Sequence, residues 1–116
     1  QAGDDLVFQL ESGYGLLRVL GVEETEDIGL VWHLAAYEDL FPDTETAETA
    51  LRQHPETMRF SIPHVAMTNR AFERAPTAKL SRRPLSDEEK SRVADWRNDP
   101  RREVVDRSAL QMLGFR

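Results

Sequence analysis

Three histidines are the residues best suited to chemistry in this 116-residue chain, which contains no cysteine. Imidazole titrates near neutral pH and is a common base and metal ligand in proteins. His33 lies within a predicted strand, His64 follows Pro63 at the start of another, and His54 precedes Pro55 at the end of a predicted helix. None of them has the H-E-x-x-H spacing or another local metal-ligand signature. We therefore expect no metal and no cofactor, and a structural or surface role for each histidine.

Other catalytic motifs are also missing from the sequence. Without cysteine, the chain has no thiol nucleophile, no disulfide framework and no cysteine-ligated zinc site. It lacks the G-x-S-x-G, Walker A and G-x-G-x-x-G patterns. The adjacent acids Glu38 and Asp39 suit general acid–base catalysis in principle, but such pairs in surface loops are usually just solvated. We expect a protein that is not an enzyme, and a small enzyme acting through His33 or His64 is the least favoured alternative.

The charge distribution favours binding. Residues 1–57 hold thirteen acidic and two basic residues, a net charge of −11, whereas residues 58–116 hold eight acidic and thirteen basic residues, a net charge of +5. Either the basic part neutralises the acidic part within the chain, or the two form separate faces, one of which meets a charged partner. If the connector after residue 37 folds beside residues 23–27, their carboxylates form one negative face that attracts a basic partner. The candidate partner-binding residues are Glu23, Glu24, Glu26, Asp27, Glu38, Asp39 and Asp43.

A basic set supports an alternative, a small nucleic-acid-associated barrel that uses the Arg-rich segment 70–102. Guanidinium groups bind phosphate well, although the overall net charge of −6 argues against a protein that coats nucleic acid. Between residues 70 and 83 only Phe72 is aromatic, whereas proteins that bind single strands use aromatic side chains for stacking. The candidate phosphate-binding residues are Arg82, Arg83, Arg101 and Arg102.

Strands are predicted for the first third of the chain, where apolar residues alternate with a period of two. The pattern predicts a hairpin over residues 6–22 and a third strand over residues 28–36. Residues 23–27 between them contain four carboxylates, which cannot be buried unpaired. We therefore expect an acidic loop at residues 23–27.

A short helix and two short strands are predicted for the middle of the chain. Asp43 is a suitable N-cap for a helix over residues 44–53, whose alanines and leucine have helical spacing. Residues 58–62 and 64–67 predict two strands on either side of Pro63. A proline between them indicates an edge, a bulge or a sharp corner.

Helices are predicted for the end of the chain. Residues 70–85 are rich in arginine and proline and predict an extended segment lying over the body. A capping box opens a helix over residues 86–98, which we expect Trp96 to anchor onto the sheet. Asp99 and Pro100 then predict a second helix, continuing to residue 113.

The layout of the first two thirds supplies a resemblance. Gly3-Asp4 opens an apolar strand, Tyr14-Gly15 leads into a strand with the step Arg18-Val19-Leu20, and an aromatic-rich strand follows at residues 32–37. In this order, residues 3–74 resemble the bacterial immunity proteins of polymorphic toxin systems, specifically the family numbered twenty-six. The pair of helices predicted after residue 85 has no counterpart in that family. The resemblance implies a binder that neutralises a toxin.

Together these patterns predict one α+β domain over residues 1–116. We expect a small bent antiparallel sheet or SH3-like barrel of about five strands, with one inserted helix and a C-terminal helical pair. The sheet body covers residues 3–69, the extended basic segment residues 70–85 and the helical pair residues 86–114. No apolar stretch approaches the roughly 20 residues of a membrane span, and the first five residues lack signal-peptide character. The function we expect is that of a cytoplasmic, non-enzymatic protein-binding module, an immunity or inhibitor protein, whose partner is a basic protein or, as the alternative, nucleic acid.

Overall fold

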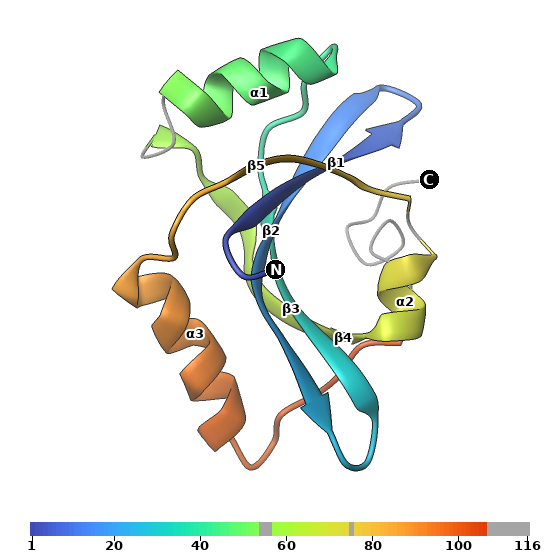
Figure 1. Ribbon diagram of the computed structural model, residues 1–116, viewed down its shortest axis with the longest axis vertical. Coiled ribbons are helices and arrows are strands. Elements are labelled where there is room, and N and C mark those ends of the chain that lie inside the picture. Colours follow the sequence, from blue (N-terminus) through green and yellow to red (C-terminus); the bar gives the residue numbers. More distant parts are fainter. Residues whose placement is uncertain (54–56, 75, 107–116) are drawn as a thin grey trace.

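The computed structural model describes residues 1–53, 57–74 and 76–106, and shows one sheet with helices on both of its faces (Figure 1). The sheet has five strands in the order β4-β3-β2-β1-β5, and all neighbouring strands are antiparallel. The elements are β1 (Asp4–Leu10), β2 (Gly13–Thr25), β3 (Gly29–Tyr37), α1 (Thr44–Gln53), β4 (Phe60–Thr68), α2 (Asn69–Glu73), β5 (Ala78–Arg82) and α3 (Asp87–Asn98). The predicted α+β class is confirmed. The sheet is strongly curved but open, because the edge strands β4 and β5 do not pair, so the bent sheet is correct and the closed barrel is not.

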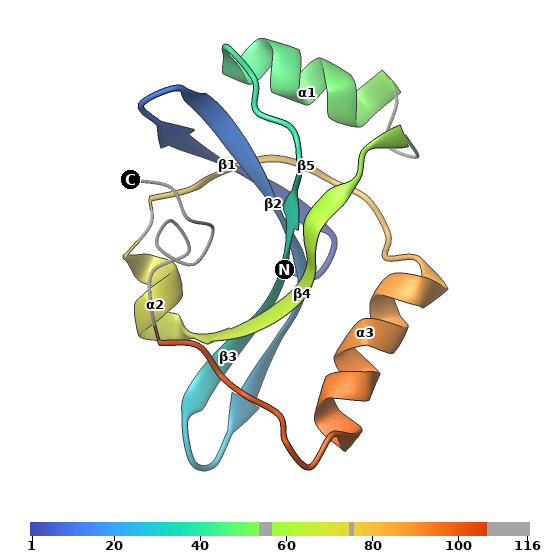
Figure 2. The same ribbon diagram turned by 180° about the vertical axis from the view of Figure 1, so that it is seen from behind.

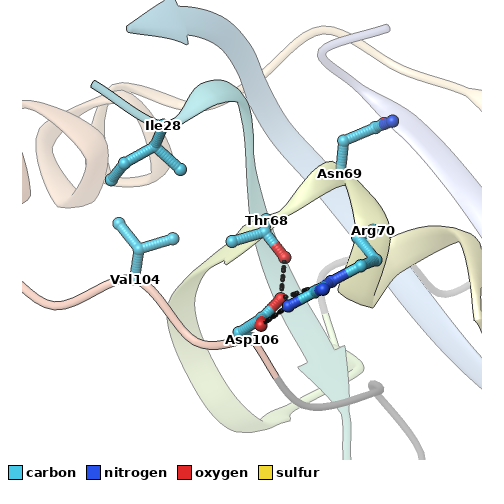
Figure 3. Close-up of a pocket in the computed structure, with 6 residues that line it drawn as sticks. All are labelled: Ile28, Thr68, Asn69, Arg70, Val104 and Asp106. Atoms are coloured by element: carbon cyan, nitrogen blue, oxygen red, sulfur yellow. Dashed lines mark hydrogen bonds and ion pairs between the residues drawn. The ribbon is translucent and has the colours of Figure 1, made fainter. Parts of the chain in front are cut away.

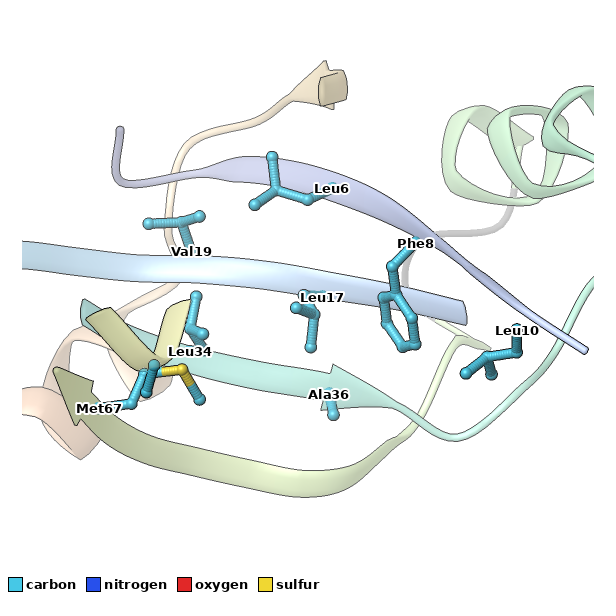
Figure 4. Close-up of a cluster of buried hydrophobic side chains, with 9 residues drawn as sticks. Leu6, Phe8, Leu10, Leu17, Val19, Leu34, Ala36 and Met67 are labelled. Carbon is cyan, nitrogen blue, oxygen red and sulfur yellow. The ribbon is translucent and has the colours of Figure 1, made fainter. Parts of the chain in front are cut away.

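The curved sheet separates α2 from α1 and α3 (Figures 1 and 2). The main apolar cluster lies on the α2 side, with partly buried Phe72 of α2 and Val105 packed against it. Figure 4 shows the labelled members projecting from the first four strands into one shared space. On the other face, α1 packs through Ala47 and Leu51, and α3 packs through Val93. The buried members of the main cluster are Leu6, Phe8, Leu10, Leu17, Val19, Leu34, Ala36, Met67 and Ala71.

The N-terminal hairpin forms as predicted, but its second strand is longer than expected. Glu23 and Glu24 lie in β2, opposite Val31 and Leu30 of β3, so the prediction of a loop beginning at residue 23 is wrong. The turn is confined to residues 26–28. The prediction assumed that a strand would bury these carboxylates. At the end of a projecting hairpin, a paired strand still leaves its side chains in contact with water or a cation, so Glu23 and Glu24 can belong to it.

The two strands predicted around Pro63 are one strand, β4, which runs through the proline. The register with β3 is irregular near this point, between the pairs Leu34–Val65 and Ala36–Ile62. Because β4 is an edge strand in the described sheet, the missing N–H of Pro63 does not break the ladder.

The prediction of an extended segment over residues 70–85 is wrong at its start and correct for its later part, which is extended as a strand of the sheet. The segment begins in the short helix α2, which Thr68 caps by accepting a hydrogen bond from the Ala71 N–H. It then forms the fifth strand, β5, which pairs with the free edge of β1. The sequence of β5 has no strong alternation of apolar and polar residues. Its extended conformation follows from the backbone hydrogen bonds that the edge of β1 offers.

The capping box is confirmed: Ser86 and Glu89 satisfy each other's backbone N–H groups at the start of α3. The second helix predicted from Asp99 does not form in residues 100–106, which are turn and extended chain, and its remainder lies outside the described residues. Val105 instead exchanges two hydrogen bonds with the outer edge of β4. None of the described helices combines the length and the apolar character that crossing a membrane requires.

Candidate functional site

The acidic candidate residues lie in two groups, at opposite ends of β3. Glu23, Glu24, Glu26 and Asp27 belong to the β2–β3 hairpin, whereas the other three follow β3 on the way to α1. Nine residues of strand separate the groups by roughly 27 Å. The single negative face that the sequence suggested does not form.

The two halves of the chain neutralise each other in part. Asp4 pairs with Lys79 and Arg82, and Asp5 pairs with Arg83. Two acids of the candidate set have structural roles as well: Glu23 pairs with Arg97, and Asp43 caps α1 by accepting a hydrogen bond from the Thr46 N–H. The described residues supply no cation to Glu24, Glu26, Asp27, Glu38 or Asp39 within ion-pair distance.

The end of the β2–β3 hairpin, residues 22–30, is apolar as well as acidic, and we call it the hairpin tip. Val22, Ile28 and Leu30 are 37, 48 and 41% exposed, which makes them three of the four large exposed apolar residues in the described chain. Glu24, Glu26 and Asp27 lie among them and are also exposed. Large apolar side chains gathered at one place on a surface mark interaction sites.

A hollow of about 430 Å³ adjoins the hairpin tip (Figure 3). Ile28 and Val104 form its apolar side, and Asp106 forms a polar wall together with Thr68 and Arg70. Thr68 Oγ1 donates a hydrogen bond to Asp106 Oδ1 over 2.6 Å, and the Arg70 guanidinium pairs with the same carboxylate. The hydrogen bond from Arg70 is the main reason that the pKa of Asp106 is lowered. The hollow therefore adds Val104 to the apolar surface of Ile28 and ends at polar groups at the start of α2.

A chain of three polar side chains crosses the opposite face of the sheet, beneath α3. His33 is fully buried, and its Nε2 lies 2.6 Å from Glu23 Oε1. Its Nδ1 lies 2.9 Å from His64 Nε2, and this hydrogen bond joins β3 to β4. The Trp96 ring packs edge-on against His33 at 4.8 Å between ring centroids, and Arg97 binds the Glu23 carboxylate. We call Glu23, His33 and His64 the histidine chain.

The order of donors in the histidine chain follows from the carboxylate at one end. An ionised carboxylate only accepts, so His33 Nε2 carries the proton. Neutral His33 then accepts at Nδ1, so His64 donates from Nε2 and keeps a bare Nδ1. This Nδ1 has no hydrogen-bonding partner among the described residues. It is also not one of their buried atoms that lack a hydrogen bond, which are Asp4 Oδ1, Arg83 Nε and Arg92 Nη1. His64 therefore presents a free acceptor nitrogen to solvent.

Burial keeps both histidines neutral near pH 7. It lowers the pKa of His33, although the hydrogen bond to Glu23 partly offsets this effect. Burial, with the charges of His33 and Arg92, lowers the pKa of His64 to about 4. Burial opposes the ionisation of Glu23, but hydrogen bonds from His33 and Arg97 outweigh it and hold the pKa of Glu23 below its ordinary value.

The sequence suggested no link between His33 and His64, which lie thirty-one positions apart. The register between β3 and β4 brings them together. His33 pairs with Ala66 of β4, and His64 lies two residues before Ala66, on the same face of the strand. In the part of the chain that the structure describes, no three His, Asp or Glu side chains are placed to hold a metal ion. The absence of tight metal binding stays a prediction.

A second polar cluster lies under the start of α3, around the fully buried Arg18 of β2. Its guanidinium binds Asp5 and Glu89, and it donates to the carbonyl oxygens of residues 3, 83 and 84. The Tyr37 hydroxyl donates to Asp5 Oδ1 over 2.7 Å and accepts a hydrogen bond from Arg83. Burial raises the pKa of this tyrosine. Because every group is tied to another element, this cluster fastens α3 and β5 to the sheet.

The four candidate phosphate-binding arginines do not form one patch. Arg82 is exposed in β5, and Arg83 is engaged by Tyr37 and Asp5. Arg101 and Arg102 lie beyond the other end of α3, a helix roughly 18 Å long. Arg102 lies over the Trp96 ring, 5.2 Å from its centroid.

Comparison of the chain with protein-family models, with curated proteins and with solved structures finds no match.

Proposed function

We propose that this protein is a non-enzymatic protein-binding module whose hairpin tip docks on a basic partner. The observation that carries the proposal is the gathering of exposed Val22, Ile28 and Leu30 with the unpaired carboxylates of the same hairpin. Apolar side chains supply binding free energy when they are buried, and carboxylates select a partner with positive charge around an apolar centre.

The shape of the hairpin tip supports this function. The tip projects beyond the end of β4, whose last residue, Thr68, pairs with Val31, and Figure 1 shows it extending away from the remaining elements. The adjoining hollow gives the partner a concave surface beside the convex tip. Charges on such a rim mainly raise the association rate, so we expect binding to weaken as the salt concentration rises.

The resemblance to immunity proteins narrows the proposed partner to a basic toxin domain, which the module would inhibit by covering it. The resemblance lies in residues 3–74, and the hairpin tip falls within that range. We place the candidate contact there rather than on Glu38, Asp39 and Asp43, which lie at the other end of β3 beside a single exposed apolar residue, Leu40.

The test compares two triple charge reversals of equal size. Glu24→Lys with Glu26→Lys and Asp27→Lys changes the hairpin tip, and Glu11→Lys with Glu38→Lys and Asp39→Lys changes exposed acids away from the tip. A partner captured from cells by the wild-type protein is purified, and its affinity is measured by calorimetry at two salt concentrations. We expect a basic protein whose binding is lost with the hairpin variant and kept with the control variant.

Two outcomes would refute the proposal. One is equal loss of partner binding in both triple variants, which would show that the partner responds to the net charge of the protein and not to the hairpin tip. The other is capture of nucleic acid that depends on arginine and survives the hairpin reversal. Arg82→Glu with Arg101→Glu tests the second outcome, because both side chains are exposed and neither belongs to the buried Arg18 cluster.

A further inference from the structure

A second hollow, of about 420 Å³, lies where the histidine chain ends, between β4 and the last turns of α3. Its lining residues are Pro63, His64, Arg92, Asp95, Trp96 and Asp99. It is linked to the base of the hairpin tip by the pair Glu23–Arg97 and by the histidine chain. It shares no lining residue with the hollow beside the hairpin tip and lies on the α3 side of the sheet.

We propose that this hollow receives a lysine or arginine side chain of the partner, with His64 Nδ1 as the central acceptor. The carboxylates of Asp95 and Asp99 would supply further acceptors at the rim. This inference rests on the proposed function, since it names the chemical group of the basic partner that enters the protein.

The histidine chain makes His64 an acceptor, rather than a donor, toward a ligand in the hollow. Its Nε2 proton is committed to His33, whose own proton is committed to Glu23, so only the lone pair of Nδ1 faces a ligand. The His64 ring, which extends from β4, is held by its hydrogen bond to His33 of β3 and therefore loses little freedom on binding. The low pKa of His64 supports this role, because the ring stays neutral near pH 7 and does not repel a cation.

The charges around the hollow favour a cationic ligand over an anionic one. The Asp95 carboxylate has no hydrogen bond or ion pair in the described chain. The Asp99 carboxylate has one hydrogen bond there, from the backbone N–H of Arg101. Arg92, the one cation in the lining, pairs with Glu88 through Nη2 and lies over the Phe60 ring, and its buried Nη1 has no hydrogen-bond partner among the described residues.

The aromatic wall of the hollow also suits a cation. The Trp96 indole already holds the guanidinium of Arg102 over its ring. Attraction between a cation and the face of an indole is the strongest of its kind among the aromatic side chains. An incoming ammonium or guanidinium group would bind the same ring by the same attraction, in place of Arg102.

Small probes test the hollow without the partner. The imidazole and indole resonances of the wild-type protein are followed by NMR during titration with Nα-acetyl-lysine amide and Nα-acetyl-arginine amide. Nα-acetyl-norleucine amide, which has a similar shape and no charge, is the control probe. We expect saturable shifts at His64 and Trp96 with at least one cationic probe and none with the neutral probe.

Variants assign the shifts to the acceptors. Asp95→Asn removes an exposed charge without disturbing the core, and we expect it to weaken probe binding about fivefold. His64→Phe removes the acceptor and keeps the ring, and we expect saturable binding to be lost. Asp39→Asn is the matched control at the far end of β3, and it should leave the titration unchanged. Equal shifts with the neutral probe, or equal titrations for wild type and Asp95→Asn, would overturn the inference.

The hairpin reversal separates this inference from the proposed function. The triple variant Glu24→Lys, Glu26→Lys and Asp27→Lys leaves every lining residue of the hollow intact, so the cationic probes should still bind to it. Loss of partner binding in this variant, with the probe titration retained, supports both proposals. A partner that depends on the hairpin tip and ignores His64→Phe supports the proposed function and refutes the hollow as its contact.

Discussion

Replacing Arg18 with leucine is expected to destabilise the protein more than any other single change of an arginine in the described chain. Arg18 is fully buried, and its guanidinium is the charge that balances Asp5 and Glu89. Leucine would leave those two carboxylates under α3 without their guanidinium partner, and removing one partner of a buried pair costs about 3–5 kcal/mol. At this chain length the change corresponds to a fall in melting temperature of at least about 10 °C.

Urea denaturation followed by the fluorescence of Trp32 and Trp96 measures the loss of stability. Arg82→Leu is the matched control, because Arg82 is exposed in β5 and its nearest carboxylate, that of Asp4, is 3.9 Å away. We expect this control to change the free energy of unfolding by less than about 0.5 kcal/mol. A loss below about 1 kcal/mol for Arg18→Leu would show that the buried cluster does not fasten α3 to the sheet.

The pH dependence of stability gives a second measurement on the same pair of proteins. Burial opposes the ionisation of Glu89, but hydrogen bonds from Arg18 and Ser86 outweigh it and hold its pKa below the ordinary value of 4.5. In the wild type, this carboxylate therefore stabilises the fold above that value, and the contribution is lost as the pH falls through the lower folded pKa.

Without Arg18 the sign should reverse. Burial would then dominate and raise the pKa of Glu89, so the variant should gain stability between pH 7 and pH 5, where the contribution of Glu89 in the wild type is constant. A difference in stability between the variant and the wild type that stays constant from pH 7 to pH 5 would contradict the role assigned to Arg18.

Three further predictions concern metal binding, the helix α3 and the close contact between Gly15 of β2 and Phe8 of β1. Calorimetry of the tag-free protein with Zn²⁺ should detect no stoichiometric site, and a micromolar site abolished by His33→Ala would show this to be wrong. Trp96→Ala should cost about 1–2 kcal/mol, less than for a fully buried tryptophan, because the ring is half-buried and packs on one side against His33; a change in melting temperature of a degree or less would argue against that packing. Gly15→Ala would place Cβ 2.4 Å from Cζ of the buried Phe8 ring and should cost about 1–3 kcal/mol in urea denaturation, with part of the loss recovered when Phe8→Leu is added.

The elements that could be predicted from the sequence are those with local signals. Alternation places Leu6, Phe8 and Leu10 on one face of a strand, and the pleat makes this face apolar whatever lies opposite. Asp43 and the Ser86 capping box begin their helices as predicted, because each satisfies backbone N–H groups within three residues of itself. The hairpin, the third strand, α1 and α3 followed from such signals.

The remaining elements depend on edges that only the folded sheet provides. β5 forms because β1 offers a free edge, and Val105 is extended because its hydrogen bonds go to the outer edge of β4 rather than into a helix. A helix start such as Asp99-Pro100 is a local preference of about 1 kcal/mol, and tertiary pairing can outweigh it.

The candidate sites show the same division. The sequence by itself determined which residues carry charge, and it placed the acids of the hairpin tip close together because they are neighbours in the chain. Only the tertiary structure decided that Glu23 binds His33 and Arg97. It also decided that His33 forms a hydrogen bond with His64, and that Arg18 binds Glu89, seventy-one positions away. These contacts depend on the register between strands and on where α3 lies, and a one-residue slip of a strand would turn each side chain to the opposite face.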